Sequence, residues 1–142
     1  MEVSAVRQQI LQAIERAKRA AAERRAANDE AAREYAVFLD QLAVPIFRQV
    51  ANILRAEGYL FNLFTPGGSV RLMSDRSADD FIELILDTTG ETPSVTGRTS
   101  RAWGHRTVLS EQPLNPSVAI RDLSEYDVLK FLLKALEPFV EK

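Results

Sequence analysis

The first 44 residues constrain this chain most, because neither glycine nor proline occurs from Glu2 to Val44 and alanine recurs at nearly every turn. Glycine and proline are the residues that most disfavour a helix interior, whereas alanine has the highest helix propensity. We therefore predict one long helix over this stretch. At 1.5 Å per residue it would be roughly 60 Å long.

Apolar and small residues follow a coiled-coil spacing along this helix. Steps of four and three residues alternate, as in a heptad whose a and d positions face a second helix. Small residues in the middle of the stripe would let two helices approach closely, and Asn28 falls at an a position, where asparagine fixes the register. The predicted interface with a second copy comprises Val3, Val6, Ile10, Ile14, Ala17, Ala21, Arg24, Asn28, Ala31, Tyr35 and Phe38.

Two other interpretations of this stretch stay open. In the first, the helix is solvated and is held by alanine propensity and by ion pairs such as Glu15 with Arg19. In the second, the helix breaks at Asn28 and Asp29, since either residue can cap a new helix, and the chain folds back as a helical hairpin. The lack of glycine favours the straight helix.

The remaining residues, 45–142, predict an α+β body. Pro45 has no N–H and either kinks the long helix or lies in the first turn of the next one, which Gly58 ends. Pro66-Gly67-Gly68 predicts a tight hairpin turn. The predicted elements are a helix over 45–57, strands over 59–65, 69–74, 80–88, 93–99 and 105–112, a loop over 101–104, and a helix that starts at Ser124 and bends or ends at Pro138.

We therefore predict a fold of class α+β with a long N-terminal helix, a second helix, an antiparallel five-stranded meander sheet and a C-terminal helix packed on the sheet. The C-terminal helix should bury Val128, Leu129, Leu132, Leu133 and Leu136. We expect two parts, a helical arm for oligomerisation over residues 1–44 and the α+β body over residues 45–142.

The sheet face turned away from the helices is predicted to be mixed. Strand alternation puts Arg71, Glu83 and Asp87 there beside an apolar patch that a lone monomer rarely exposes. We add this patch to the predicted oligomer interface. It consists of Phe64, Met73, Phe81 and Ile85. The alternative is a strand register shifted by one residue, which would turn these side chains into the core.

The sequence carries few candidates for chemistry. It contains one histidine and no cysteine, so we expect no metal site, no cofactor and no catalytic residue, and the glycine-rich turn lacks the lysine of a phosphate-binding loop. Guanidinium groups beside an indole can hold a phosphate, a carboxylate or an unpaired base. The predicted ligand-binding group is Arg98, Arg101, Trp103, His105 and Arg106.

Composition gives little direction on partners. A net charge of −2, with 27% charged residues, provides no general attraction to nucleic acid or to anionic membranes, and the absence of cysteine fits a reducing compartment. We expect a cytoplasmic, noncatalytic protein without a membrane segment. It would associate with itself, as a dimer by preference, and would present its body to another protein. The alternatives are an anion or small-ligand binder or enzyme that uses the Arg98–Arg106 region, and a nucleic-acid-associated dimer.

Overall fold

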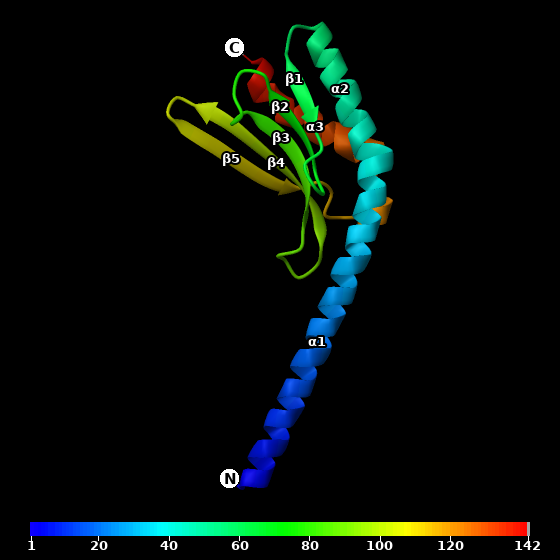
Figure 1. Ribbon diagram of the computed structural model, residues 1–142, viewed down its shortest axis with the longest axis vertical. Coiled ribbons are helices and arrows are strands. Elements are labelled where there is room, and N and C mark those ends of the chain that lie inside the picture. The colour runs from blue at the N-terminus through cyan, green and yellow to red at the C-terminus, as the bar shows by residue number, and fades with distance from the viewer. Residues whose placement is uncertain (142) are drawn as a thin grey trace.

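The computed structural model describes residues 1–141 and has the predicted α+β architecture (Figure 1). A long N-terminal helix and a second helix lie on one side, with a five-stranded antiparallel sheet and a C-terminal helix beside them. The elements are α1 (Val3–Phe38), the π-helical η1 (Leu39–Ala43), α2 (Val44–Ala56), β1 (Phe61–Phe64), β2 (Val70–Ser74), β3 (Phe81–Asp87), β4 (Ser94–Trp103), β5 (Arg106–Pro113), the 3-10 helix η2 (Ile120–Asp122) and α3 (Glu125–Val140).

The first three elements form one continuous helix of 54 residues, Val3–Ala56, about 81 Å long at 1.5 Å per residue. It passes through Asn28 without a break, which contradicts the helical-hairpin alternative. At η1 the helix widens by one residue, and the Val44 N–H donates to the carbonyl of Leu39, five residues earlier. Pro45 follows directly, and because its ring crowds the preceding turn and it has no N–H, this wider turn accommodates it within the helix.

The core lies between this helix, α3 and one face of the sheet. Phe38 of α1, Phe47 of α2 and Leu132 of α3 are buried against Leu72 and Ile82 of the sheet. Apolar burial of this kind is the main favourable term in folding.

Three residues that we predicted for the oligomer interface belong to this core. Ala31, Tyr35 and Phe38 are 6%, 4% and 4% exposed, and the Tyr35 hydroxyl donates to the carbonyl of Leu84 at 3.2 Å. Their placement between copies was therefore wrong, because the chain's own body covers that part of the stripe. Residues 31–43, which we had assigned to the arm, contribute to the core of the body.

The sheet is the predicted antiparallel meander, with strand order β1-β2-β3-β4-β5. Leu72 lies opposite Ile82 on the core face, and Met73 lies opposite Phe81 on the other face. The predicted alternation is thus correct, and the shifted register is excluded. Phe64 is 42% exposed, whereas Met73, Phe81 and Ile85 are half-buried.

The fourth strand is longer than predicted. The residues that we had placed in a loop, 101–103, continue β4, and a two-residue turn of Gly104 and His105 leads to β5. Gly104 has φ +60°, as the first central residue of a type II′ hairpin turn requires. This correction changes which side chains share a face.

The C-terminal helix also differs from its prediction. Ser124 and Asp127 form the expected capping box, but α3 continues past Pro138 to Val140. Its buried face includes Phe131 and Ala135, whereas Leu129 and Leu133 are exposed. The reason lies in β4, where Gly97 has no side chain and the Phe131 ring occupies the space that a Cβ would need.

Candidate functional site

The N-terminal part of α1 projects from the body (Figure 1). Every residue from 3 to 27 is exposed except Ala21, which is half-buried. Val3, Ile10 and Ile14 keep 85%, 54% and 45% of their surface accessible. We call this segment, residues 3–27, the free arm, and its large apolar residues stay exposed in the described chain, residues 1–141.

The continuous helix also meets a simple criterion for crossing a membrane. By length and composition alone, Val3–Ala56 contains an 18-residue window apolar enough to do so. Core helices of soluble proteins meet the same criterion. In this helix Phe38, Ala43, Phe47 and Ala51 are buried in the core.

The five residues predicted as a ligand-binding group do not gather at one site. Because successive side chains of a strand point to opposite faces, the extension of β4 puts Arg98 on the outer face and Arg101 and Trp103 on the helix-facing side. His105 lies in the exposed hairpin turn, and Arg106 begins β5. The predicted group is therefore divided between two faces and a turn.

Arg98 is part of a row of charges that crosses the outer face of the sheet. Arg71, Glu83, Arg98 and Glu111 lie opposite one another on β2, β3, β4 and β5. Glu83 accepts from Arg71 at 2.8 Å and from Arg98 at 3.2 Å, and Arg98 donates to Glu111 at 2.9 Å. We call this row the charge ladder. The sequence alone missed it, because its four members become neighbours only once the strand register is known.

The charge ladder limits what the outer face can bind. Glu83 is 2% exposed, and a carboxylate so far removed from water requires charged partners. Both arginines supply that compensation, and the Arg71 guanidinium also lies 4.1 Å from the centre of the Phe81 ring. Arg98 is therefore committed to the carboxylates beside it, so the ladder adds no stripe of unpaired positive charge for nucleic acid.

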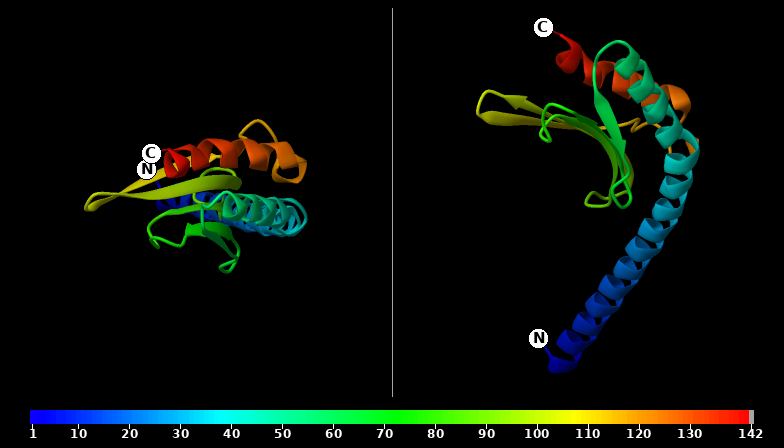
Figure 2. Two further views of the ribbon diagram at one scale, coloured as in Figure 1. Left: turned by 90° about the horizontal axis from the view of Figure 1, so that it is seen from above. Right: turned by 45° about the horizontal axis from the view of Figure 1, so that its top comes forward.

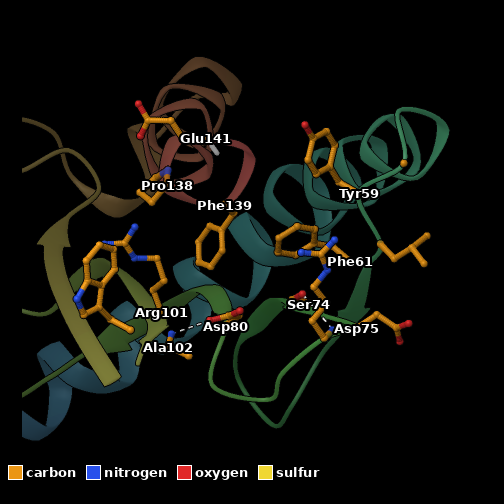
Figure 3. Close-up of a pocket in the computed structure, with 14 residues that line it drawn as sticks. Tyr59, Phe61, Ser74, Asp75, Asp80, Arg101, Ala102, Pro138, Phe139 and Glu141 are labelled. Carbon is orange, nitrogen blue, oxygen red and sulfur yellow. Dashed lines mark hydrogen bonds between the residues drawn. The ribbon is translucent and has the colours of Figure 1, made fainter. Parts of the chain in front are cut away.

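A pocket of about 380 Å³ lies between the start of β1, the turn before β3, the end of β4 and the end of α3 (Figure 3). Arg101 and Trp103 line it, with the Arg101 guanidinium 5.0 Å from the centre of the indole. Phe139 meets Phe61 edge to face, with ring centres 5.7 Å apart. The dashed line between Ala102 and Asp80 in Figure 3 is the 2.7 Å hydrogen bond from the Ala102 N–H to the Asp80 carboxylate.

The lining of this pocket carries both signs of charge. Arg76 and Arg101 are matched by three carboxylates, those of Asp75, Asp80 and Glu141. An anion would meet these carboxylates as well as the guanidinium groups, so the lining selects no single class of ligand. Neither His105 nor Arg106 lines the pocket. Among residues 1–141, no three His, Cys, Asp or Glu side chains gather where they could hold a metal ion.

Comparisons with protein-family models, curated proteins and solved structures found no match to this chain.

Proposed function

We propose that this protein is a noncatalytic, self-associating module in which the free arm pairs with the free arm of a second copy, while the body is presented to another protein. The observation that carries the proposal is the exposure of Val3, Val6, Ile10, Leu11 and Ile14 on a helical segment that the body does not reach. A large exposed apolar stripe is typical of an interaction surface.

The energetics favour a second helix as the partner of the free arm. Ile10 and Ile14 are about half exposed, so covering each would contribute on the order of 1 kcal/mol, and a symmetric dimer doubles that contribution. Alanine predominates between Ala17 and Ala27 and permits close approach of two helices. Isolated helical segments are marginal in water, so pairing would also stabilise the arm as a helix. We place this association in the cytoplasm, consistent with a chain that lacks cysteine.

The body offers a separate surface for another protein. Tyr126, Leu129 and Leu133 of α3 are 67%, 38% and 59% exposed, and their spacing of three and four residues puts them in one row. Such a row suits an apolar groove or helix of a partner. None of these three residues belongs to the free arm, so both surfaces can be used by one molecule.

The arm pairing is tested by sedimentation equilibrium of the full chain and of the double substitution Ile10→Lys and Ile14→Lys. We expect the unchanged chain to form a dimer or a larger species and the variant to sediment at a lower mass, because lysines at positions 10 and 14 would bury unpaired charge between the two arms. Val37→Lys is the matched control, since Val37 is 54% exposed on the same helix but lies outside the predicted stripe. An unchanged chain that stays monomeric at high micromolar concentration contradicts the proposal.

A further inference from the structure

The last strand, β5, forms an open edge of the sheet. All eight of its residues are exposed, and β4 pairs with it on one side only. Both views of Figure 2 show the β4–β5 hairpin projecting past the helices. An edge of this length presents a row of unpaired backbone donors and acceptors, and native proteins usually protect such edges with charged side chains, proline or a bulge. From Thr107 to Ser110 this strand has none of these.

The backbone groups of β5 that point away from β4 can be identified from the hydrogen bonds around β4. The Leu114 N–H, just after β5, donates to the carbonyl of Val95 in β4, in the same register as the β4–β5 pairs. The Ala102 N–H of β4 donates instead to the Asp80 carboxylate, on the β3 side. Inward and outward groups alternate along an antiparallel strand. Both observations therefore give the same result: the N–H and C=O groups of Thr107, Leu109 and Glu111 point away from β4. By the same alternation the backbone nitrogen of Pro113 faces away from β4, so its lack of an N–H costs no hydrogen bond between the two strands.

Thr107 and Glu111 lie two residues to either side of Leu109. Their outward donors and acceptors can therefore pair with the same groups on the β5 strand of a second copy. We propose that the β5 edges of two copies pair antiparallel about a two-fold axis at Leu109 and join their sheets. In this register Thr107 lies opposite Glu111 of the second copy, and Leu109 lies opposite its own counterpart. Every outward donor then meets an outward acceptor. A shift by two residues in one direction puts Glu111 opposite His105 in the hairpin turn, and a shift in the other direction puts Thr107 opposite Pro113, which has no N–H to donate.

The side chains agree with this register. On the helix-facing side it puts Val108 opposite Ser110 and Arg106 opposite Gln112, so no like charges face each other. Leu109, which is 64% exposed, gains an apolar neighbour on the outer face. An extended segment of another protein could supply backbone pairing as well, but nothing in this strand selects its side chains, whereas the strand's own sequence is complementary to itself.

This interface uses no residue of the free arm, so it goes beyond the proposed function. Two separate two-fold interfaces on one chain continue from copy to copy rather than ending at a dimer. A protein that pairs by its arm and by its β5 edge would form a closed ring or an extended assembly, as a scaffold requires.

The test is disulfide cross-linking in the full chain carrying Ile10→Lys and Ile14→Lys, so that failure of the arm proposal does not affect the result. The chain has no cysteine of its own, so a single introduced cysteine reports one contact. Under mild oxidation Leu109→Cys should form a covalent dimer at least ~10-fold faster than Thr107→Cys, because the proposed register brings only residue 109 within disulfide reach of itself. Equal rates, or no dimer from Leu109→Cys, would overturn the proposal and leave the edge to another partner.

A second measurement separates backbone pairing from side-chain contact. Cysteines at both Thr107 and Glu111 should cross-link two copies, since these positions lie opposite each other. Adding Leu109→Pro should abolish this cross-linking, because it removes the central outward N–H without removing a backbone hydrogen bond to β4. Leu109→Thr keeps that N–H and should retain the cross-linking. Circular dichroism verifies that both variants fold. Cross-linking that survives Leu109→Pro in a folded chain contradicts edge pairing.

Discussion

The two parts of the continuous helix have the same period but different surroundings. Ile14 and Tyr35 are three heptads apart and therefore lie on the same face. Ile14 is 45% exposed, whereas Tyr35 is 4% exposed and donates to Leu84 of the sheet. The difference arises from what is next to the helix, since the body reaches Ala31 but not the free arm. A regular apolar stripe thus indicates that a face will be covered, without indicating which surface covers it.

The residue types along the stripe follow this difference. Where the body covers it, the stripe contains the large side chains of Tyr35 and Phe38, which fill the space between the helix and the sheet. In the free arm from Ala17 to Ala27 its apolar members are mostly alanines, which fill little volume but allow a second helix to come close. The change from alanine to aromatic residues near Ala31 therefore marks where packing within the chain begins.

The largest expected effect comes from shortening the chain at two points. A chain that begins at Ala27 should keep a folded body, because it retains Ala31, Tyr35 and Phe38. A chain that begins at Asp40 should lose cooperative unfolding, since two missing core aromatics together cost as much as the whole stability of a typical domain, about 5–15 kcal/mol. Denaturant unfolding followed by circular dichroism distinguishes the two. If the chain starting at Asp40 unfolds at the same denaturant concentration, residues 31–39 are not part of the core.

A smaller effect is expected from one substitution in each part of the helix. Phe38→Ala should lower the free energy of unfolding by about 3–5 kcal/mol, because it opens a cavity in the core. Ile14→Ala should change it by less than about 0.5 kcal/mol when measured at low protein concentration, where the arm is unpaired. Equal losses from the two substitutions would mean that the free arm folds back onto the body, and the comparison between the two parts would fail.

Sequence reasoning predicted the fold well where the signal was local. The length without glycine or proline, the turn at Pro66-Gly67-Gly68 and the capping box at Ser124 each depend on a few neighbouring residues, and the structure has all of them. Strand alternation also identified the outer face correctly. These features depend on backbone preferences that the chain expresses without long-range contacts.

The errors came from contacts between distant segments. Val128, Leu132 and Leu136 are buried as predicted. Nothing near Phe131 in the sequence shows that its ring packs over Gly97, which is why Leu129 and Leu133 were predicted to be buried in place of Phe131 and Ala135. Likewise, the loop expected at 101–104 hid the alternation that separates Arg98 from Arg101. The charge ladder needs the register of four strands, and the β5 edge needs the direction of each N–H. The candidate surfaces were thus less predictable than the fold.

The smallest effect tests how firmly the covered part of the helix is held. Burial in the core, with the Glu83 carboxylate nearby, raises the pKa of the Tyr35 hydroxyl above its ordinary value of 10.0. The neutral hydroxyl is therefore the form that the folded state favours. Its contribution to stability is complete below pH 10 and is lost as the pH rises from the unfolded pKa toward the folded pKa, by about 1.4 kcal/mol per pH unit.

Tyr35→Phe should therefore cost about 1 kcal/mol at pH 7, through the lost hydrogen bond to Leu84, and this difference should vanish near pH 11. Urea unfolding of both proteins at the two pH values measures it. Tyr126→Phe is the control, because that side chain is 67% exposed on α3 and its hydroxyl remains in water in both states. A difference that is the same at both pH values would show that Tyr35 reaches solvent, and the covered part of the helix would then resemble the free arm.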